Sequence, residues 1–196
     1  MKKVTKTWMA ILGITIIGFA GCSAKKEVIA KTPIQDLKAP KWVVKGSGAF
    51  ASERGKIFYG VGAASNMENS SLLRTAADNR ARNEVSKVFQ FYTASLMKDY
   101  MASTSAGRPG VTAEEQHVEQ AIKTVTAITL SGVEIVDHWQ NPGTMEMFSL
   151  ARLDLAAFKD SLDKAKELDA KTKEYIRQNA EKLHEQLEKE EQKMNR

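Results

Sequence analysis

Alternating side-chain patterns mark three stretches of the chain as β-strands. Residues 57–63 (IFYGVGA) form the first stretch, and residues 133–140 and 144–155 form the second and third. A period of two is what a strand requires, because successive side chains point to opposite faces of a sheet. Asn-Pro-Gly at 141–143 separates the last two stretches and favours a turn. We therefore predict one strand followed, much later in the chain, by a β-hairpin.

Apolar residues spaced three and four apart predict two helices between the first strand and the hairpin. These helices cover residues 70–102 and 113–129, and the segment STSAGRPG at 103–110 separates them. Thr112 and Glu115 have the spacing of a capping box at the start of the second helix. The stripes expected to be buried are Leu73, Ala77, Ala81, Val85, Val88, Tyr92, Leu96 and Tyr100 in the first helix, and Val118, Ala121, Ile122, Val125 and Ile128 in the second.

A third helical pattern starts at Ala156 and continues without proline or glycine to the end of the chain. Its first part carries a stripe expected to face the core. Beyond Lys171 the apolar positions become sparse, and charges of both signs dominate. Such a helix is expected to be mostly solvated, or to be held in a coiled coil by a narrow seam. The core-facing stripe is Phe158, Leu162, Ala165 and Leu168, and the seam is Tyr175, Ile176, Ala180, Leu183 and Leu187.

The region before the first strand carries weaker signals. Residues 41–44 (KWVV) are expected to form a short edge strand or a docking segment, and residues 45–55, rich in glycine and serine, are expected to form a loop. The resulting order is strand, helix, helix, hairpin, helix. This order predicts an α+β domain with a small antiparallel-type three-stranded sheet, packed on one face by helices and followed by a long charged C-terminal helix.

The N-terminal residues have the pattern of an export signal. Lys2, Lys3 and Lys6 precede an uncharged, mostly apolar stretch at residues 8–20. That stretch is shorter than the roughly 20 residues that cross a bilayer. A basic start, a short apolar core and small residues at its end are typical of a cleaved signal peptide, here residues 1–21. An uncut N-terminal anchor helix is the alternative interpretation.

Cys22 is the only cysteine in the chain, so it cannot form an internal disulfide. The segment Phe19-Ala20-Gly21-Cys22 resembles the bacterial lipobox, although phenylalanine stands where leucine is usual. The resemblance implies that Cys22 is lipidated with acyl chains such as palmitate and becomes the mature N-terminus. Ser23 follows in place of the aspartate that resembles an inner-membrane retention signal, which implies the outer membrane of a Gram-negative envelope. Stable anchoring takes two or more acyl chains, and lipoproteins of this type carry three.

Charge gives no argument for nucleic acid as a partner. The chain has 29 Lys+Arg against 24 Asp+Glu, and three of these lysines belong to the expected signal peptide. The remainder is close to neutral, whereas nucleic-acid-binding domains carry a clustered basic excess. The rest of the chain divides into an expected tether at 22–40, containing Pro33 and Pro40, an α+β domain at 41–170 and a charged helical extension at 171–196.

Gly60-Val61-Gly62 after a strand invites comparison with a phosphate-binding loop. The dinucleotide fingerprint needs a third glycine at position 65, where this chain has Ser65, and a Walker motif is absent. We instead expect these glycines to let a helix lie close across the strand, with Gly62 also helping the turn into that helix. The sequence therefore predicts no cofactor site here.

Catalytic and metal-binding readings find little support in the sequence. His117, His138 and His184 fall in three different elements without ligand spacing, and no serine has a nucleophile-elbow context. Arg74, Arg80 and Arg82 are expected to be a solvated helix face with one member paired into the sheet edge, rather than an anion patch. We expect no enzyme activity, no catalytic residues, no metal and no cofactor.

Two tryptophans are candidate partner contacts. Trp42 and Trp139 are flanked by polar residues and lie near the ends of expected elements. Core packing is the ordinary use of such residues. The other use is a partner-binding surface, where tryptophan is over-represented.

The stretch KIFYGVGAAS…LLRTAADNRARNEVSKVF resembles the LPP-twenty family, a family of twenty-kilodalton bacterial outer-membrane lipoproteins. The matching features are Tyr59 to Gly62, the small residues Ala76, Ala77 and Ala81 with Arg82, and an upstream Pro40 and Trp42. The resemblance covers about residues 40–155. It implies a β-α-β-β domain similar to the N-terminal domain of a flagellar assembly protein, and no catalytic residues.

From these observations we expect a non-enzymatic lipoprotein, anchored to the outer membrane through Cys22, with a periplasmic or surface-facing interaction domain. The expected partners are the membrane and either an unidentified envelope protein or a second copy bound through the C-terminal helix. The alternative is an assembly or activation factor for an envelope machine, such as a flagellar or cell-wall synthesis complex.

Overall fold

The computed structural model describes residues 38–52, 55–104 and 113–194, and within them the chain builds a four-stranded antiparallel sheet. The strands are β1 (Gly48–Ser52), β2 (Gly55–Ala64), β3 (Glu134–Gln140) and β4 (Met147–Asp154), in the spatial order β1-β2-β4-β3. The α+β class is confirmed. The expected signal peptide, Cys22 and most of the expected tether lie outside the described residues.

The sheet has one strand more than the sequence predicts. Residues 45–55 were expected to be a loop, but Gly48 to Ser52 pair with β2 as an antiparallel strand. The five residues GAFAS have little strand propensity of their own, so β1 depends on its pairing with β2. Phe50 is buried and lies beside Tyr59 on the neighbouring strand, with ring centroids 6.0 Å apart.

The expectation of an edge strand at 41–44 is wrong, because Lys41–Lys45 form a one-turn helix, α2. Pro40 stands at its N-cap position, and Gly46 ends it with a φ of 77°, a value that glycine adopts without strain. Four residues are too few to show a period, so the pattern gave no sign of a helix here.

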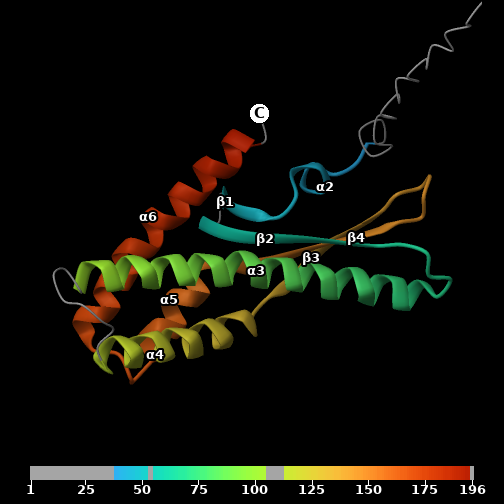
Figure 1. The fold of residues 1–196 in the computed structure, drawn as a ribbon. Helices are drawn as coiled ribbons and strands as arrows, with labels where there is room; N and C mark the ends of the chain where they lie inside the picture. The colour runs from blue at the N-terminus through green and yellow to red at the C-terminus, as the bar shows by residue number, and fades with distance from the viewer. Residues whose placement is uncertain (1–37, 53–54, 105–112, 195–196) are drawn as a thin grey trace, which may run out of the picture. The chain divides into compact units, whose positions relative to one another are not determined.

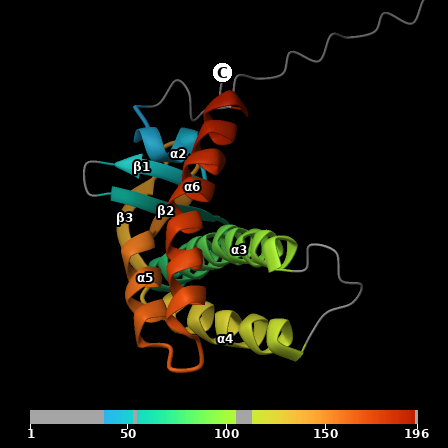
Figure 2. The same ribbon diagram turned by 90° about the vertical axis from the view of Figure 1, so that its left-hand side faces the viewer.

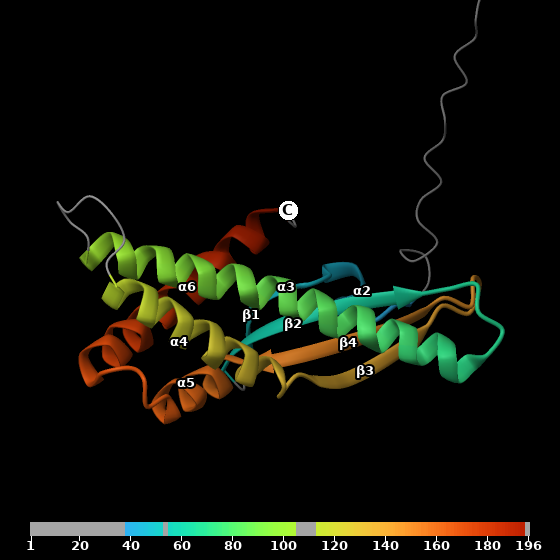
Figure 3. The same ribbon diagram turned by 60° about the horizontal axis from the view of Figure 1, so that its bottom comes forward.

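The long helix α3 (Ser70–Thr104) lies along one face of the sheet (Figure 1; Figure 3). Gly60 and Gly62 face it, and its own small residues Ala77 and Ala81 are fully buried against them. A Cβ at Gly62 would lie 2.2 Å from the backbone nitrogen of Ala81. The expected close approach of helix and strand is confirmed. The expected turning role of Gly62 is wrong, because β2 continues to Ala64 and Asn66 takes the positive φ, 60°, before the helix.

The buried stripe of α3 matches the prediction except at one turn. Phe89 is fully buried, whereas Val88 is only partly buried. Phe58 of β2 packs against Phe89 with ring centroids 5.2 Å apart, and against Tyr92 at 4.9 Å. Aromatic side chains fill the space between helix and sheet here, where β2 carries Phe58 in place of a glycine.

Helices α4 (Ala113–Leu130) and α5 (Leu155–Lys164) extend the helical layer (Figure 2). Phe158 and Leu162 of α5 are buried as predicted. In α4, Ile128 was expected in the buried stripe but is 57% exposed, and Thr129 is buried instead. The hydroxyl of Thr129 donates to the carbonyl of Val125, 2.8 Å away, which removes the cost of burying it.

The C-terminal pattern is two helices rather than one. After α5 the chain turns through residues 165–169, and α6 runs from Ala170 to Met194. The Asp169 carboxylate accepts a hydrogen bond from the backbone N–H of Thr172, 2.8 Å away, which is an N-cap contact. A helix can therefore end and restart here without proline or glycine.

The interpretation of residues 171–196 as a mostly solvated helix or coiled coil is corrected by the packing of α6. Ile176, Ala180 and His184 are buried on the domain itself. The Tyr92 hydroxyl donates to the carbonyl of Ala180, 2.8 Å away, and Lys56 Nζ lies 2.8 Å from a Glu185 carboxylate oxygen. The seam that was expected to pair with a partner is thus largely used inside the domain. No helix among the described residues is long and apolar enough to span a membrane.

The hairpin has a longer connection than predicted. Strand β4 begins at Met147 rather than at 144, so residues 141–146 form the connection. The buried Asn141 fixes it, since its side-chain oxygen accepts hydrogen bonds from the backbone N–H groups of Gly143 and Thr144. Strand β3 is one of the two edges of the sheet and is irregular between Ile135 and Asp137, which interrupts the straight edge that another strand would need.

His184 attaches α6 to β2 in a way that depends on its protonation. Its Nε2 lies 3.2 Å from the carbonyl oxygen of Ile57, which can only accept, so Nε2 donates. Its buried Nδ1 has no hydrogen-bond partner among the described residues. Burial therefore lowers the pKa of His184, despite the hydrogen bond to Ile57 and the nearby carboxylate of Glu188, which favour the charged form.

We expect the domain to lose stability as the pH falls below about 6.5, the ordinary histidine pKa. The unfolded chain then binds a proton that folded His184 does not, so the free energy of unfolding falls until the lowered folded pKa is passed. The slope has an upper limit of about 1.4 kcal/mol per pH unit for one proton. Urea unfolding at pH 5.0–7.5 measures it, and His184→Gln should flatten the curve. Parallel curves for both proteins would contradict this assignment.

Candidate functional site

The two tryptophans predicted as partner contacts lie on the same face of the sheet, opposite α3. The Trp42 indole Nε1 of α2 donates to the Asp137 carboxylate of β3, 2.8 Å away. Trp139 lies two residues further along β3 and packs on Phe148, with ring centroids 5.5 Å apart. Both tryptophans are partly exposed. The structure thus places them on one face, and each is also held by a contact within the domain.

A polar cluster lies on the other face of the sheet, under the first half of α3. Asp78 of α3 accepts hydrogen bonds from His138 Nε2 of β3 and from the Ser149 hydroxyl of β4, both at 2.7 Å. Arg74 lies 3.3 Å from His138 Nδ1. Because Arg74 only donates, His138 accepts at Nδ1 and donates at Nε2, a neutral form that satisfies both neighbours.

The charge of Asp78 is stabilised by this cluster. Partial burial opposes its ionisation, but the hydrogen bonds from Ser149 and His138 outweigh that effect and lower its pKa. Ser149 is fully buried, and its hydroxyl donates a hydrogen bond to a carboxylate instead of an imidazole. A nucleophilic serine needs an imidazole base and an open approach. The chemistry of this cluster is therefore that of a cross-link between α3, β3 and β4.

The three arginines of the first half of α3 are exposed, as predicted for a solvated helix face, but two of them rather than one contact the sheet. Arg80 donates to the backbone carbonyl of Ala63 on β2, and Arg74 contacts His138 on β3. Arg82 lies close enough to Asp78 to favour its charged form. An arginine bonded to a carbonyl is positioned by the protein rather than open to an anion.

The histidines lie in separate surroundings. His117 of α4 lies 3.1 Å from the carbonyl of Glu167, His138 contacts Asp78, and His184 contacts Ile57. Within the part of the chain that the structure describes, no group of three His, Cys, Asp or Glu side chains could hold a metal ion.

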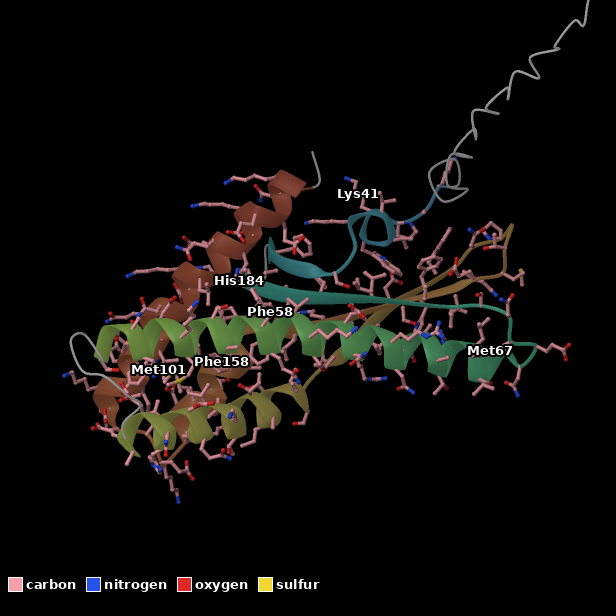
Figure 4. All side chains as sticks on the ribbon, in the orientation of Figure 1. Lys41, Phe58, Met67, Met101, Phe158 and His184 are labelled. Carbon is pink, nitrogen blue, oxygen red and sulfur yellow. The ribbon has the colours of Figure 1, made fainter. Side chains whose placement is uncertain are left out.

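A groove of about 700 Å³ runs between α3 and α4, on the far side of α3 from the tryptophans. The two helices run side by side in opposite directions (Figure 1; Figure 3). Met101 lies toward α4 near the end of α3 (Figure 4). The lining residues are Gln90, Thr93, Ala94, Met97, Lys98 and Met101 of α3, and Glu119, Ile122, Lys123, Thr126, Ala127 and Leu130 of α4.

The groove has an apolar floor and a polar rim. Met97 and Ile122 are buried, as are Thr93 and Thr126. Both threonine hydroxyls donate to carbonyls of their own helices, at 3.2 Å for Thr93 and 2.7 Å for Thr126. The floor therefore presents no unsatisfied hydroxyl to a ligand. Lys123 at the rim is paired with Glu119 at 2.7 Å.

Sequence reasoning missed this groove, although a signal for it exists. The stripe predicted for α3 ran through Leu96 and Tyr100, and next to it Ala94, Met97 and Met101 form a second apolar line. An apolar face wider than one stripe indicates a helix with contacts on two sides. Of the predicted site residues, Trp42 and Trp139 lie on the same face of the sheet, and Cys22 lies outside the described residues.

Comparison with known proteins adds no assignment: neither the models of known protein families nor the sequences of curated proteins match this chain.

Proposed function

We propose that the protein is a non-enzymatic lipoprotein, anchored to the outer membrane of a Gram-negative envelope through lipidated Cys22, whose α+β domain is a binding module. The observation that carries the proposal is the position of the only cysteine, directly after Ala20 and Gly21 at the end of a short apolar stretch. A thiol in that place suits an acylation site, and it has no second cysteine in the chain with which to form a disulfide.

The geometry of the domain supports a binding role over a chemical one. The polar cluster around Asp78 is occupied by contacts among α3, β3 and β4. Surfaces that remain open are the groove between α3 and α4 and the half-exposed tryptophans on the opposite face of the sheet. The LPP-twenty resemblance supports the same class of protein.

A second candidate function is an assembly or activation factor for an envelope machine, such as a flagellar or cell-wall synthesis complex. The placement of Trp42 and Trp139 on one face of the sheet favours it, because partly exposed aromatic residues are enriched at protein-binding surfaces. Val44, two residues after Trp42 in α2, adds a side chain that is 58% exposed.

The test of the anchor is Cys22→Ala in cells that process lipoproteins. We expect the wild-type protein to have the mass of residues 22–196 plus lipid and to fractionate with the outer membrane. The variant should stay uncleaved or appear in the inner-membrane fraction, because acylation precedes cleavage in the lipoprotein class that the lipobox resembles. Intact mass and membrane fractionation measure both effects.

Ser23→Asp is the matched control, since it leaves Cys22 in place. It should keep the lipidated mass and shift the protein toward the inner membrane. A Cys22→Ala protein that still fractionates with the outer membrane would refute the lipoprotein proposal. Crosslinking from position 44 in the same cells separates the two candidate functions. An assembly factor should give one dominant crosslinked protein partner, whereas the first proposal does not require one.

A further inference from the structure

We propose that the groove between α3 and α4 binds a long-chain fatty acid, with the acyl chain along its floor and the carboxylate at Lys98. The inference concerns the domain alone and does not depend on the anchor at Cys22.

The floor of the groove suits an unbranched apolar chain. Met97 and Ile122 supply flexible and branched apolar side chains from the two helices, and the hydroxyls of Thr93 and Thr126 are already satisfied. A ligand on this floor meets no polar atom that needs a hydrogen bond, so a methylene chain loses nothing by displacing water. Thioether side chains adapt their shape to such ligands.

The charged side chains at the rim favour a ligand with one anionic end. Lys123 is neutralised by Glu119 across one helical turn of α4. Lys98 on α3 is exposed, and among the described residues no carboxylate lies within ion-pair distance of it. One cation therefore remains at the groove, opposite in charge to a carboxylate. The rim as a whole carries two lysines and one glutamate, which favours a single anionic group.

The dimensions favour a single chain over a partner helix. The lining covers residues 90–101 and 119–130, which corresponds to about 16 Å along each helix at the α-helical rise. A volume of about 700 Å³ lies in the range of small-molecule sites, roughly 300–1,000 Å³. A helix is about 10 Å across with its side chains, so it would rest on the rim rather than enter the groove.

The test uses the full chain as its host cell processes it, mixed with phosphatidylcholine vesicles that contain a palmitic acid bearing a diazirine. Irradiation followed by peptide mass spectrometry locates the label. We expect the label in peptides covering residues 90–101 and 119–130. Lys98→Glu should reduce it at least about five-fold, because the exposed side chain is not needed for folding and its reversed charge repels the carboxylate.

A second variant blocks the groove without touching its charge. Ala127→Trp places a large side chain at an exposed lining position and should remove most of the label, whereas Thr124→Trp, exposed on the same helix and outside the lining, should retain it. Circular dichroism melting confirms that both variants are folded. Label spread over the whole surface, confined to the N-terminal peptide, or unchanged in both Lys98→Glu and Ala127→Trp would overturn the proposal.

Discussion

Replacing Gly62 by alanine should destabilise the domain by about 3 kcal/mol or more, the upper end of the range for overpacking. The added Cβ would lie 2.2 Å from the backbone nitrogen of Ala81 and 2.4 Å from the carbonyl oxygen of Ala77. Real Cβ atoms do not approach other heavy atoms so closely, so α3 must move away from the sheet. The melting temperature should fall by about 6–12 °C at the usual sensitivity for a domain of this size.

The size of this effect follows from what blocks the new methyl group. A clash with the end of a side chain is relieved by a rotamer change, but here the blocking atoms belong to the backbone of α3. The helix is held along its length by other contacts, including Phe89 and Tyr92 against Phe58. Moving it away from Gly62 therefore loosens the packing of its neighbours as well.

Gly143→Ala is the matched control for Gly62→Ala. A Cβ at Gly143 would lie 3.5 Å from the side-chain oxygen of Asn141, which is ordinary contact. The change should alter the free energy of unfolding by less than about 0.5 kcal/mol. Ala77→Gly combined with Gly62→Ala should give no rescue, since removing the Ala77 side chain leaves its backbone carbonyl in place. Full rescue by that double variant would show that the backbone contact is not the cause.

The same contact explains which parts of the fold were accessible from the sequence. Gly60 and Gly62 alternate along one strand face, and Ala77 and Ala81 repeat at one-turn spacing, so two small-residue patterns of different period meet. Small residues at these positions indicate that the strand and the helix pack closely against each other. Long elements with strong periods, such as α3 and the first turns of α5, were predictable for the same reason.

The failures occur where neighbours decide the structure. Strand β1 has no pattern of its own and exists because β2 offers it a partner. The break between α5 and α6 depends on the single capping side chain of Asp169. The charged surface of α6 conceals a narrow buried line, Ile176, Ala180 and His184, that is indistinguishable in sequence from a coiled-coil seam. Tertiary contacts override local preference in the first and third cases, whereas the Asp169 cap is a local signal that the spacing of apolar residues does not reveal.

The candidate site shows a similar division. The sequence identified Trp42 and Trp139 one at a time, but their position on one face of the sheet depends on the contact of Trp42 in α2 with Asp137 in β3. The groove depends on the spacing of α3 and α4, which no residue of either helix encodes alone. The LPP-twenty resemblance rests on Tyr59 to Gly62 and on the alanines of α3, which the structure places at the β2–α3 contact. Those motifs therefore reflect how α3 packs on β2, and a test of function has to change other residues.

Phe58→Ala should lower the free energy of unfolding by about 3–5 kcal/mol, the usual cost of removing a buried phenylalanine. Phe58 is fully buried and packs from the sheet against α3 and α6, in the region where Figure 4 labels Phe58, Phe158 and His184. Its ring centroid lies 5.2 Å from Phe89 of α3 and 5.0 Å from His184 of α6. Phe89 in turn contacts Phe158 of α5 at 5.5 Å, so the cavity would open where all these elements meet.

Phe91→Ala is the matched control, because Phe91 lies on α3 but is 64% exposed. Urea titration of both variants measures the effect, and Phe91→Ala should change the free energy of unfolding by less than about 0.5 kcal/mol. The Phe58 variant should also weaken the attachment of α6, since His184 loses its aromatic neighbour and Tyr92 loses the ring that orients its hydroxyl toward Ala180. Amide hydrogen exchange would then rise first in residues 176–184. An equal effect of the two substitutions would mean that α6 and the sheet are stabilised separately, without a shared aromatic centre.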